Sequence, residues 1–335
     1  MLVTFYVIAY NHEKMIADAI KAAFSQTYSP LQIIISDDCS TDGTWEVIQR
    51  VVKSYQGSHS VISRRNDRNL GVAGHINEIW NVCRGEWIVA SAGDDISCPN
   101  RVSRIMEIVT QRPRVKLVQS FLNEVDEEGS FVYLNRLGSD LERADISTFG
   151  LSERLGGTSY APHGAAMAYS RELIDFFPRM PPEVIFEDNI VNLRAELLGD
   201  AVLIAEPLVN HTNHDGQITR VSCGASPADR EKSRQRRLVS DVASTRQNIE
   251  DIRLAFECDK ISQSVARPLI ELFCERYAYF RLRLKMLTDC WPRSLFSLTL
   301  MLVRYGTNKH SLFSRDEFLK AFLPYTLYRI LKMNR

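Results

Sequence analysis

The sequence predicts an α/β fold, in which helices flank a mostly parallel sheet and a further helical region follows at the C-terminal end. Within the first hundred residues, short runs rich in β-branched residues alternate four times with segments of helical periodicity. Such alternation is typical of a parallel sheet with helices on both faces. The chain has 335 residues, of which 45% are hydrophobic and 24% are charged, and this composition excludes disorder and low complexity.

The repeated units of the first half are placed by their hydrophobic pattern. We expect strands at residues 2–9, 32–36, 61–64 and 86–91. The helices between and after these strands are expected at residues 15–24, 47–52, 73–83 and 99–109. In sheets of this kind ligands bind beyond the carboxyl ends of the strands. The turns that follow these strands are therefore the first candidates for a functional site.

The alternation breaks after residue 115. We expect further strands at residues 116–121, 130–134 and 164–170, and two short closing strands at 201–205 and 207–211. The polar stretch from residue 135 to residue 157 predicts loops with little core. Helices are expected at residues 171–177 and 187–198, and a long helical region begins at Ser226, with breaks near residues 259–262 and 291–292.

Charge and cysteine usage exclude several classes of protein. Lys and Arg number 41 and Asp and Glu number 41, so no nucleic-acid partner is expected. Residues 1–260 carry 28 basic and 36 acidic side chains, and residues 261–335 carry 13 and 5. A basic tail of this kind suits an anionic membrane surface, although a solvated helix face is the alternative. Seven scattered cysteines without a C-x-x-C pair indicate reduced thiols, and no apolar run is long enough to span a bilayer, so we expect a cytoplasmic protein.

Polar residues follow three of the expected strands. Residues 9–12 (AYNH) come after the first strand, residues 37–43 (DDCSTDG) after the second and residues 92–95 (AGDD) after the fourth. None of these turns contains G-x-G-x-x-G or the P-loop pattern, so dinucleotide and P-loop phosphate binding are disfavoured.

Each of the two pairs of adjacent aspartates has more than one possible role. Asp37 and Asp38 can bind the base or ribose of a nucleoside, or they can form a turn that caps the following helix, or one aspartate does each. Asp94 and Asp95 repel each other unless a cation or a donor network offsets their charge, and such carboxylates suit Mg²⁺ or Mn²⁺ held jointly with substrate phosphates. The alternative for this second pair is capping of the helix that opens at Pro99.

Six short motifs follow one another in the order and at the spacing of family 2 glycosyltransferases of the bacterial glycan and O-antigen biosynthesis type, which the chain therefore resembles. They are residues 7–11 (VIAYN), 25–28 (SQTY), 35–44 (ISDDCSTDGT), 69–72 (NLGV), 85–88 (GEWI) and 94–101 (DDISCPNR). The resemblance implies a GT-A fold, with a Rossmann-like nucleotide-sugar-binding half at residues 1–112 and an acceptor-binding half at 113–224. Residues 225–335 would form the helical C-terminal region.

The resemblance also implies a donor site. Ala9, Tyr10 and Asn11 would line the nucleotide pocket, and Asp38 would hydrogen-bond the base, most often uracil. The full set of donor-binding residues that it implies is Ala9, Tyr10, Asn11, Asp37, Asp38, Asn69, Gly71, Gly93, Asp94 and Asp95.

A divalent cation, Mn²⁺ or Mg²⁺, is the implied cofactor. Asp94 matches the last carboxylate of the family's D-x-D metal motif, with Asp95 beside it, but Ala92 stands where the first carboxylate would be. His214 is the third implied ligand, because a histidine near this point often approaches the metal or diphosphate in GT-A enzymes. For His211 we expect a packing role.

On the acceptor side, residues 184–189 (VIFEDN) resemble the family's ED motif, in which the aspartate is the general base. This assigns catalysis to Asp188, with Glu187 beside it. A helix N-terminus would hold the Asp188 carboxylate ionised and ready to accept a hydroxyl proton; the alternative is simple capping of that helix. His163 and Gly164 precede a strand similar to the family's acceptor-side segment. No Q-x-x-R-W sequence follows, which argues against a processive synthase.

These features predict an inverting, metal-dependent glycosyltransferase that moves one sugar from a nucleotide diphosphate sugar, with UDP favoured. The acceptor would be a hydroxyl of a glycan or of a lipid-diphosphate-linked saccharide, as the resemblance implies. A non-catalytic nucleotide-sugar binder is the alternative that Ala92 suggests, and a nucleotidyltransferase is disfavoured because residues 9–12 offer no Gly-rich basic loop. The cationic and aromatic C-terminal helices predict peripheral membrane contact, packing on the catalytic domain or a homodimer contact.

Overall fold

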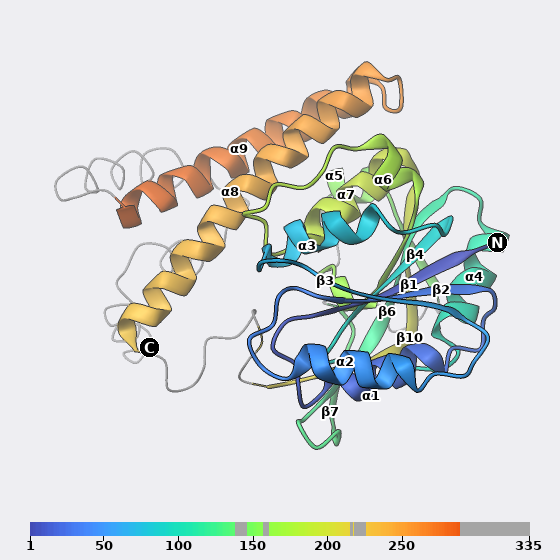
Figure 1. Cartoon of the computed structure of the whole chain (residues 1–335). Coiled ribbons are helices and arrows are strands. Elements are labelled where there is room, and N and C mark those ends of the chain that lie inside the picture. Colours follow the sequence, from blue (N-terminus) through green and yellow to red (C-terminus); the bar gives the residue numbers. More distant parts are fainter. Residues whose placement is uncertain (138–145, 157–160, 215–216, 218–225, 289–335) are drawn as a thin grey trace.

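A mixed ten-stranded sheet forms the centre of the molecule (Figure 1). The computed structural model describes residues 1–137, 146–156, 161–214, 217 and 226–288. Eight strands follow the order β3-β2-β1-β4-β9-β6-β10-β5, while β7 pairs with β6 and β8 pairs with β10. The predicted α/β class is thereby confirmed.

The first half of the chain forms the predicted parallel part of the sheet. Its strands are β1 (Val3–Ala9), β2 (Leu31–Asp37), β3 (Ser60–Arg65) and β4 (Trp87–Ala92), and neighbouring strands among them pair in parallel. Its helices are α1 (Ile16–Phe24), α2 (Thr44–Lys53), α3 (Gly71–Trp80) and α4 (Arg101–Gln111). All seven residues of β2 are buried, as expected for a strand covered by helices on both faces.

The second half adds mainly antiparallel pairs. Its strands are β5 (Ile96–Ser97), β6 (Val115–Val125), β7 (Phe131–Asn135), β8 (Ile146–Phe149), β9 (Met167–Ser170) and β10 (Asp200–Thr212). A 3₁₀ turn at Gly164–Ala166 precedes β9, and the helices are α5 (Leu151–Leu155), α6 (Glu172–Phe176) and α7 (Asp188–Leu198). Strand β9 is antiparallel to both β4 and β6, so it joins the parallel half to the remainder of the sheet.

Several sequence predictions differ from the structure, and one of them is the strand expected at residues 164–170, which begins at Met167 after the 3₁₀ turn. The expected loops are wrong for residues 146–155, which form β8 and α5, because β8 gains its pairing from β10, about fifty residues further along the chain. The two closing strands are one strand, β10, with register irregularities on both sides of Pro207. Proline has no N–H to donate to the ladder, which explains why the sequence suggested a break there. The two-residue strand β5 carries no periodic signal and was not predicted.

Two hydrophobic cores lie on opposite faces of the sheet. One packs α1, α2 and α4 against the sheet, and the other packs α3, α6 and α7 together with the C-terminal helices. Figure 1 shows α8 (Pro227–Glu257) and α9 (Gln263–Thr288) as an antiparallel pair lying over this second layer.

The C-terminal helices dock on the domain through buried contacts. Ser226 caps α8, where its side chain accepts a hydrogen bond from the Asp229 N–H. Arg194 on α7 forms a fully buried ion pair with Asp251 on α8, with 2.7 Å between Nε and Oδ2. The predicted break near residues 259–262 is confirmed, and the one at 291–292 lies outside the described residues. Among the described helices, none has the length and apolar character that a membrane span needs.

Candidate active site

A cleft of about 690 Å³ opens at the carboxyl ends of β1 and β4. Residues from the β1 and β4 turns, the 3₁₀ turn, the start of α7 and helix α8 line it. This position agrees with the rule that α/β sheets bind ligands beyond the strand carboxyl ends. The predicted site residues that line the cleft are Ala9, Tyr10, Asp38, Asn69, Gly71, Asp94, Asp95, His163, Gly164, Glu187 and Asp188.

Four predicted site residues do not line the cleft: Asn11, Asp37, Gly93 and His214. Asn11 has a positive φ of 57°, and its Oδ1 accepts a hydrogen bond from the Thr41 N–H at 2.8 Å, so it shapes the turn after β1. Asp37 is fully buried and is paired with Arg65. Gly93 packs against the His12 ring, since a Cβ at this position would lie 2.7 Å from His12 Nδ1. His214 reaches the site through Asp94.

Asp38 lines the cleft and also holds the adjacent loop. Its Oδ1 accepts from Asn66 Nδ2 at 2.7 Å and from the Leu70 N–H at 2.9 Å, and its Oδ2 accepts from the Gly71 N–H at 3.0 Å. A carboxylate oxygen has two lone pairs, so Oδ2 can accept one further hydrogen bond from a ligand. Asp37, in contrast, accepts from the Ser40 N–H within the turn. This agrees with the alternative in which one aspartate shapes the turn and the other contacts the ligand.

Two histidines flank Asp94. His214 Nε2 lies 2.9 Å from Asp94 Oδ2, and His12 Nε2 lies 3.8 Å from the same oxygen. Burial raises the pKa of Asp94, but the hydrogen bond with His214 and the nearby His12 outweigh it and lower the pKa below its usual value. One ligand atom from each residue lies within 4.8 Å of the others. An ionised carboxylate and two imidazoles fit a first-row divalent cation.

The second carboxylate of this turn is in a different environment. Asp95 is almost fully buried, and its Oδ1 accepts from the Thr212 N–H at 3.2 Å, which ties the β4 turn to the end of β10. Burial and the charge of Asp94 raise the pKa of Asp95 to about 7. Its role as a metal ligand stays a prediction.

Asp188 and Glu187 also line the cleft, at the start of α7. Asp188 Oδ1 accepts from the Asn189 N–H at 2.8 Å, and Glu187, at the N-cap position, makes no capping bond with its side chain. Burial raises the pKa of Asp188 to about 7, and burial together with the charge of Asp188 raises the pKa of Glu187 to about 8. The expected effect of the helix terminus is therefore outweighed by desolvation. A carboxylate whose pKa lies near 7 suits a general base at neutral pH.

Gly164 allows the acceptor-side turn to approach the carboxylates. A Cβ at this position would lie 2.3 Å from Glu187 Oε1. Beside it, His163 packs edge-on against His211, with 4.6 Å between ring centroids. Burial and the neighbouring His211 lower the pKa of His163 to about 4, so its imidazole is neutral.

Some residues of the site were missed by sequence reasoning. His211, expected to pack, also lines the cleft, and its Nδ1 lies 2.8 Å from Glu124 Oε2. Burial lowers the pKa of His211, but the Glu124 hydrogen bond and the charge of Asp95 outweigh it and raise the pKa to about 9. His12 lies in the polar turn after β1, which was an available signal, but a lone histidine carries little weight. Arg236 enters the cleft from α8, which the sequence suggested as a separate region.

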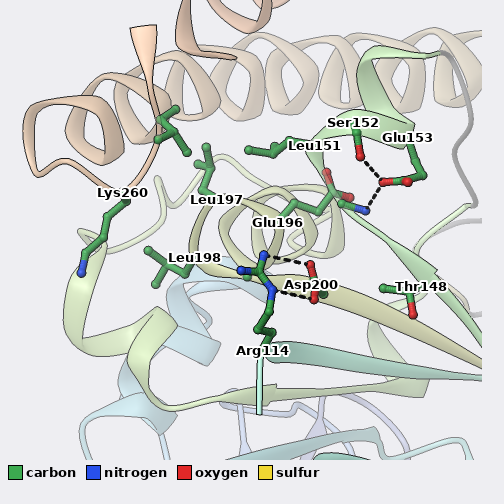
Figure 2. Close-up of a pocket in the computed structure, with 13 residues that line it drawn as sticks. Arg114, Thr148, Leu151, Ser152, Glu153, Glu196, Leu197, Leu198, Asp200 and Lys260 are labelled. Carbon is green, nitrogen blue, oxygen red and sulfur yellow. Dashed lines mark hydrogen bonds and ion pairs between the residues drawn. The ribbon is translucent and has the colours of Figure 1, made fainter. Parts of the chain in front are cut away.

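A second hollow of about 470 Å³ lies where β6 and β10 begin, at the other end of these strands (Figure 2). Arg114 pairs with Asp200 there, with 3.2 Å between Nε and Oδ2, and Glu153 accepts from Ser152. Glu196 pairs with Arg154. Asp200 and Glu196 thus each have an arginine partner, and among the residues that line this hollow no group of three potential metal ligands is brought together.

Comparison with known proteins agrees with this geometry. The model of the family "Glycosyl transferase family 2" matches residues 4–177, more than half of the chain. The chain belongs to this family, and it is a glycosyltransferase.

Two curated relatives of the chain come from bacteria. The chain is 33% identical over 102 residues to the Escherichia coli protein WfaP, named a UDP-Glc:alpha-D-GlcNAc-diphosphoundecaprenol beta-1,3-glucosyltransferase, with 30% of this chain and 39% of WfaP covered. It is 28% identical over 120 residues to the putative glycosyltransferase EpsE of Bacillus subtilis, with 36% of this chain and 42% of EpsE covered. The chain thus spans less than half the length of these two relatives.

The fold matches that of a solved structure. The crystal structure of Staphylococcus aureus TarS residues 1–349 in complex with UDP-GlcNAc superposes with a TM-score of 0.60 at 16% identity, covering 96% of this chain and 82% of that one. At this level of identity the likeness establishes the GT-A fold, as the sequence predicted.

Proposed function

We propose that the protein is an inverting, metal-dependent, non-processive glycosyltransferase that transfers one sugar from a UDP-sugar to a hydroxyl of a glycan or lipid-diphosphate-linked saccharide. One observation carries the proposal: a single cleft is lined both by Asp94, which belongs to a cluster of three potential metal ligands, and by the carboxylate of Asp188. The UDP-GlcNAc complex of TarS and the diphosphate-linked acceptor in the name of WfaP support the donor and acceptor classes.

Two groups of residues in the cleft would divide the chemistry of the transfer. Asp188 accepts the proton of the acceptor hydroxyl, and the oxygen attacks the anomeric carbon of the donor from the side opposite the diphosphate. The bond between that carbon and the diphosphate oxygen breaks, which inverts the configuration. Asp94 and His214 would hold the cation, and a bound Mn²⁺ or Mg²⁺ supplies positive charge for the departing diphosphate. Asp38 and Tyr10 would hold the base and Asn69 the adjoining part of the donor.

An arginine on α8 supports the proposal that the acceptor bears a phosphate group. Arg236 lines the cleft, and it takes part in none of the ion pairs among residues that the structure describes. An arginine fork binds phosphate oxygens well. Helix α9 carries Arg276, Arg281, Arg283 and Lys285, which supports peripheral contact with an anionic cytoplasmic membrane face.

Acceptor kinetics test the role of Arg236. Arg236→Ala should raise KM for a diphosphate-linked acceptor about tenfold and leave KM for the UDP-sugar unchanged, whereas Arg246→Ala, an exposed change on the same helix, should alter neither. With an acceptor that lacks phosphate, Arg236→Ala and the unchanged protein should behave alike. An equal increase in KM for both acceptors would show that Arg236 does not recognise the phosphate.

The catalytic proposal is tested by Asp188→Asn. Transfer should fall by about 100-fold or more, because the amide cannot accept the proton, while UDP binding stays unchanged. Asp175→Asn is the matched control, since this aspartate on α6 is 63% exposed. A transfer rate of Asp188→Asn close to that of the unchanged protein would refute the assignment of the base. If the unchanged protein binds UDP but transfers no sugar to any acceptor, the non-catalytic binder suggested by Ala92 replaces the enzyme.

A further inference from the structure

Three strands bring side chains to one point at the edge of the cleft. His12 comes from the turn after β1, Asp94 from the turn after β4 and His214 from the segment after β10. Ala92, which also lines the cleft, ends in a methyl group and cannot bind a cation. Within the described residues, this is the group of three potential metal ligands that the structure brings together.

The backbone of His12 is fixed by hydrogen bonds, whereas its ring makes none with a described residue. The His12 N–H donates to Thr44 Oγ1 at 2.8 Å, and its carbonyl accepts from the N–H groups of Met15 and Ile16, both at 2.9 Å. The ring makes no hydrogen bond with a described residue: Nδ1 is buried without a partner, and Nε2 lies 3.8 Å from Asp94 Oδ2, too far for one. A polar ring held in place without a partner has capacity for a ligand.

The neighbouring glycine keeps space for this ring. A Cβ on Gly93 would lie 2.7 Å from His12 Nδ1 and 2.9 Å from Ile16 Cδ1. The His12 and His214 rings are nearly perpendicular, at 87°, with 6.2 Å between their centroids. Both imidazoles can therefore point at a common position beside Asp94 without stacking.

The separations of the ligand atoms suit an octahedral cation. With bonds of about 2.1 Å, adjacent ligand atoms lie about 3 Å apart and opposite ones about 4.2 Å apart. The distances from Asp94 Oδ2, 2.9 Å to His214 Nε2 and 3.8 Å to His12 Nε2, fall within or close to this range. Three protein ligands leave positions for two diphosphate oxygens and a water.

We propose that His12 is a protein ligand of the divalent cation, in the role that the side chain of Ala92 cannot fill, and that two imidazoles make the site select Mn²⁺ over Mg²⁺. Imidazole nitrogen is a good ligand for first-row transition metals, whereas Mg²⁺ favours oxygen ligands. The inference rests on the metal dependence in the proposed function, and it names the residue and the preference that follow from this chain's own sequence.

Direct metal binding tests the proposal on the full chain. Free Mn²⁺ is measured by its electron paramagnetic resonance signal in the presence of UDP, for the unchanged protein, His12→Ala, His12→Glu and the control His59→Ala. His12→Ala should raise the Kd for Mn²⁺ at least tenfold, and the control should not change it. His12→Glu supplies an oxygen in place of nitrogen and should lower the ratio of Mn²⁺ affinity to Mg²⁺ affinity at least fivefold. Circular dichroism confirms that each variant is folded.

A spectroscopic count separates ligation from a structural effect. Pulsed electron paramagnetic resonance of bound Mn²⁺ should show two coordinated imidazole nitrogens in the unchanged protein and one in His12→Glu. If Asp94→Ala loses Mn²⁺ while His12→Ala binds it as before, His12 is not a ligand, although the proposed function stands. If the unchanged protein binds no Mn²⁺ and transfers sugar in the presence of a chelator, both this inference and metal dependence are refuted.

Discussion

The ion pair that docks α8 on the domain gives a prediction with a calculable size. Arg194 and Asp251 are both fully buried, joined by hydrogen bonds of 2.7 and 3.2 Å. Arg194 also donates to the Pro178 carbonyl, and Gln247 donates to Asp251 at 2.8 Å. Asp251→Ala removes the counter-charge and leaves the guanidinium of Arg194 in an apolar environment, over the ring of Phe177.

The cost follows from the burial of the remaining charge. Breaking a buried pair on one side costs about 3–5 kcal/mol of unfolding free energy. At about 2–4 °C per kcal/mol for a domain of this size, Tm should fall by roughly 6–20 °C. Replacing both partners with apolar residues, Arg194→Met with Asp251→Leu, should recover most of that loss, because no unpaired charge remains.

Thermal and urea unfolding followed by circular dichroism measure these changes. Arg267→Ala is the matched control, since Arg267 forms an exposed pair with Glu271 on α9, and its loss should cost less than about 0.5 kcal/mol. The reasoning is refuted if Asp251→Ala lowers the free energy of unfolding by no more than this control does. It is also refuted if the apolar double variant is no more stable than Asp251→Ala alone.

Three further results are expected at the cleft. Because burial raises the pKa of Asp188 to about 7 and the base must be ionised, kcat/KM should rise about tenfold per pH unit below pH 7 and level off above it; a flat profile from pH 5.5 to 8 would contradict this. Gly164→Ala should lower transfer at least tenfold, because the new Cβ, 2.3 Å from the present position of Glu187 Oε1, would displace this carboxylate beside Asp188, while Gly156→Ala, with 3.3 Å to its nearest neighbour, should not. Asp38→Ala should weaken UDP binding at least tenfold by calorimetry, since it frees three hydrogen-bond donors of the loop; unchanged affinity would show that this loop does not hold the base.

The parallel half of the fold was predictable because its signals are local. Apart from the two-residue β5, each strand and helix from Val3 to Gln111 has its own period, and the carboxyl ends of parallel strands meet at one edge. Strand β8 could not be found in this way, since its residues pair with Leu203 and its neighbours, far along the chain. The prediction of β10 as two strands was wrong because proline is usually found at the end of a strand. Here Pro207 lies at an irregularity in the register within one strand.

The site was predictable where a motif carries it. Asp94 and His214 are 120 residues apart, yet the resemblance to the family suggested both, and they lie 2.9 Å apart. The contributions of Glu124 and Arg236 depend on which strands and helices lie beside the cleft. A local sequence pattern does not predict this arrangement. The pKa of Asp188 was judged from the helix terminus alone, but the burial that raises it is a property of the assembled walls.

Nucleotide binding with and without metal tests the central claim most directly. Thermal shifts are measured with UDP, GDP, dTDP and CMP, each with and without Mn²⁺, because a ligand that binds the folded state raises Tm. We predict stabilisation by UDP that requires Mn²⁺ and disappears in Asp94→Ala. No shift with any nucleotide, or a shift with UDP that is equal without metal and in Asp94→Ala, would contradict the assignment of this cleft as a metal-dependent UDP-sugar site.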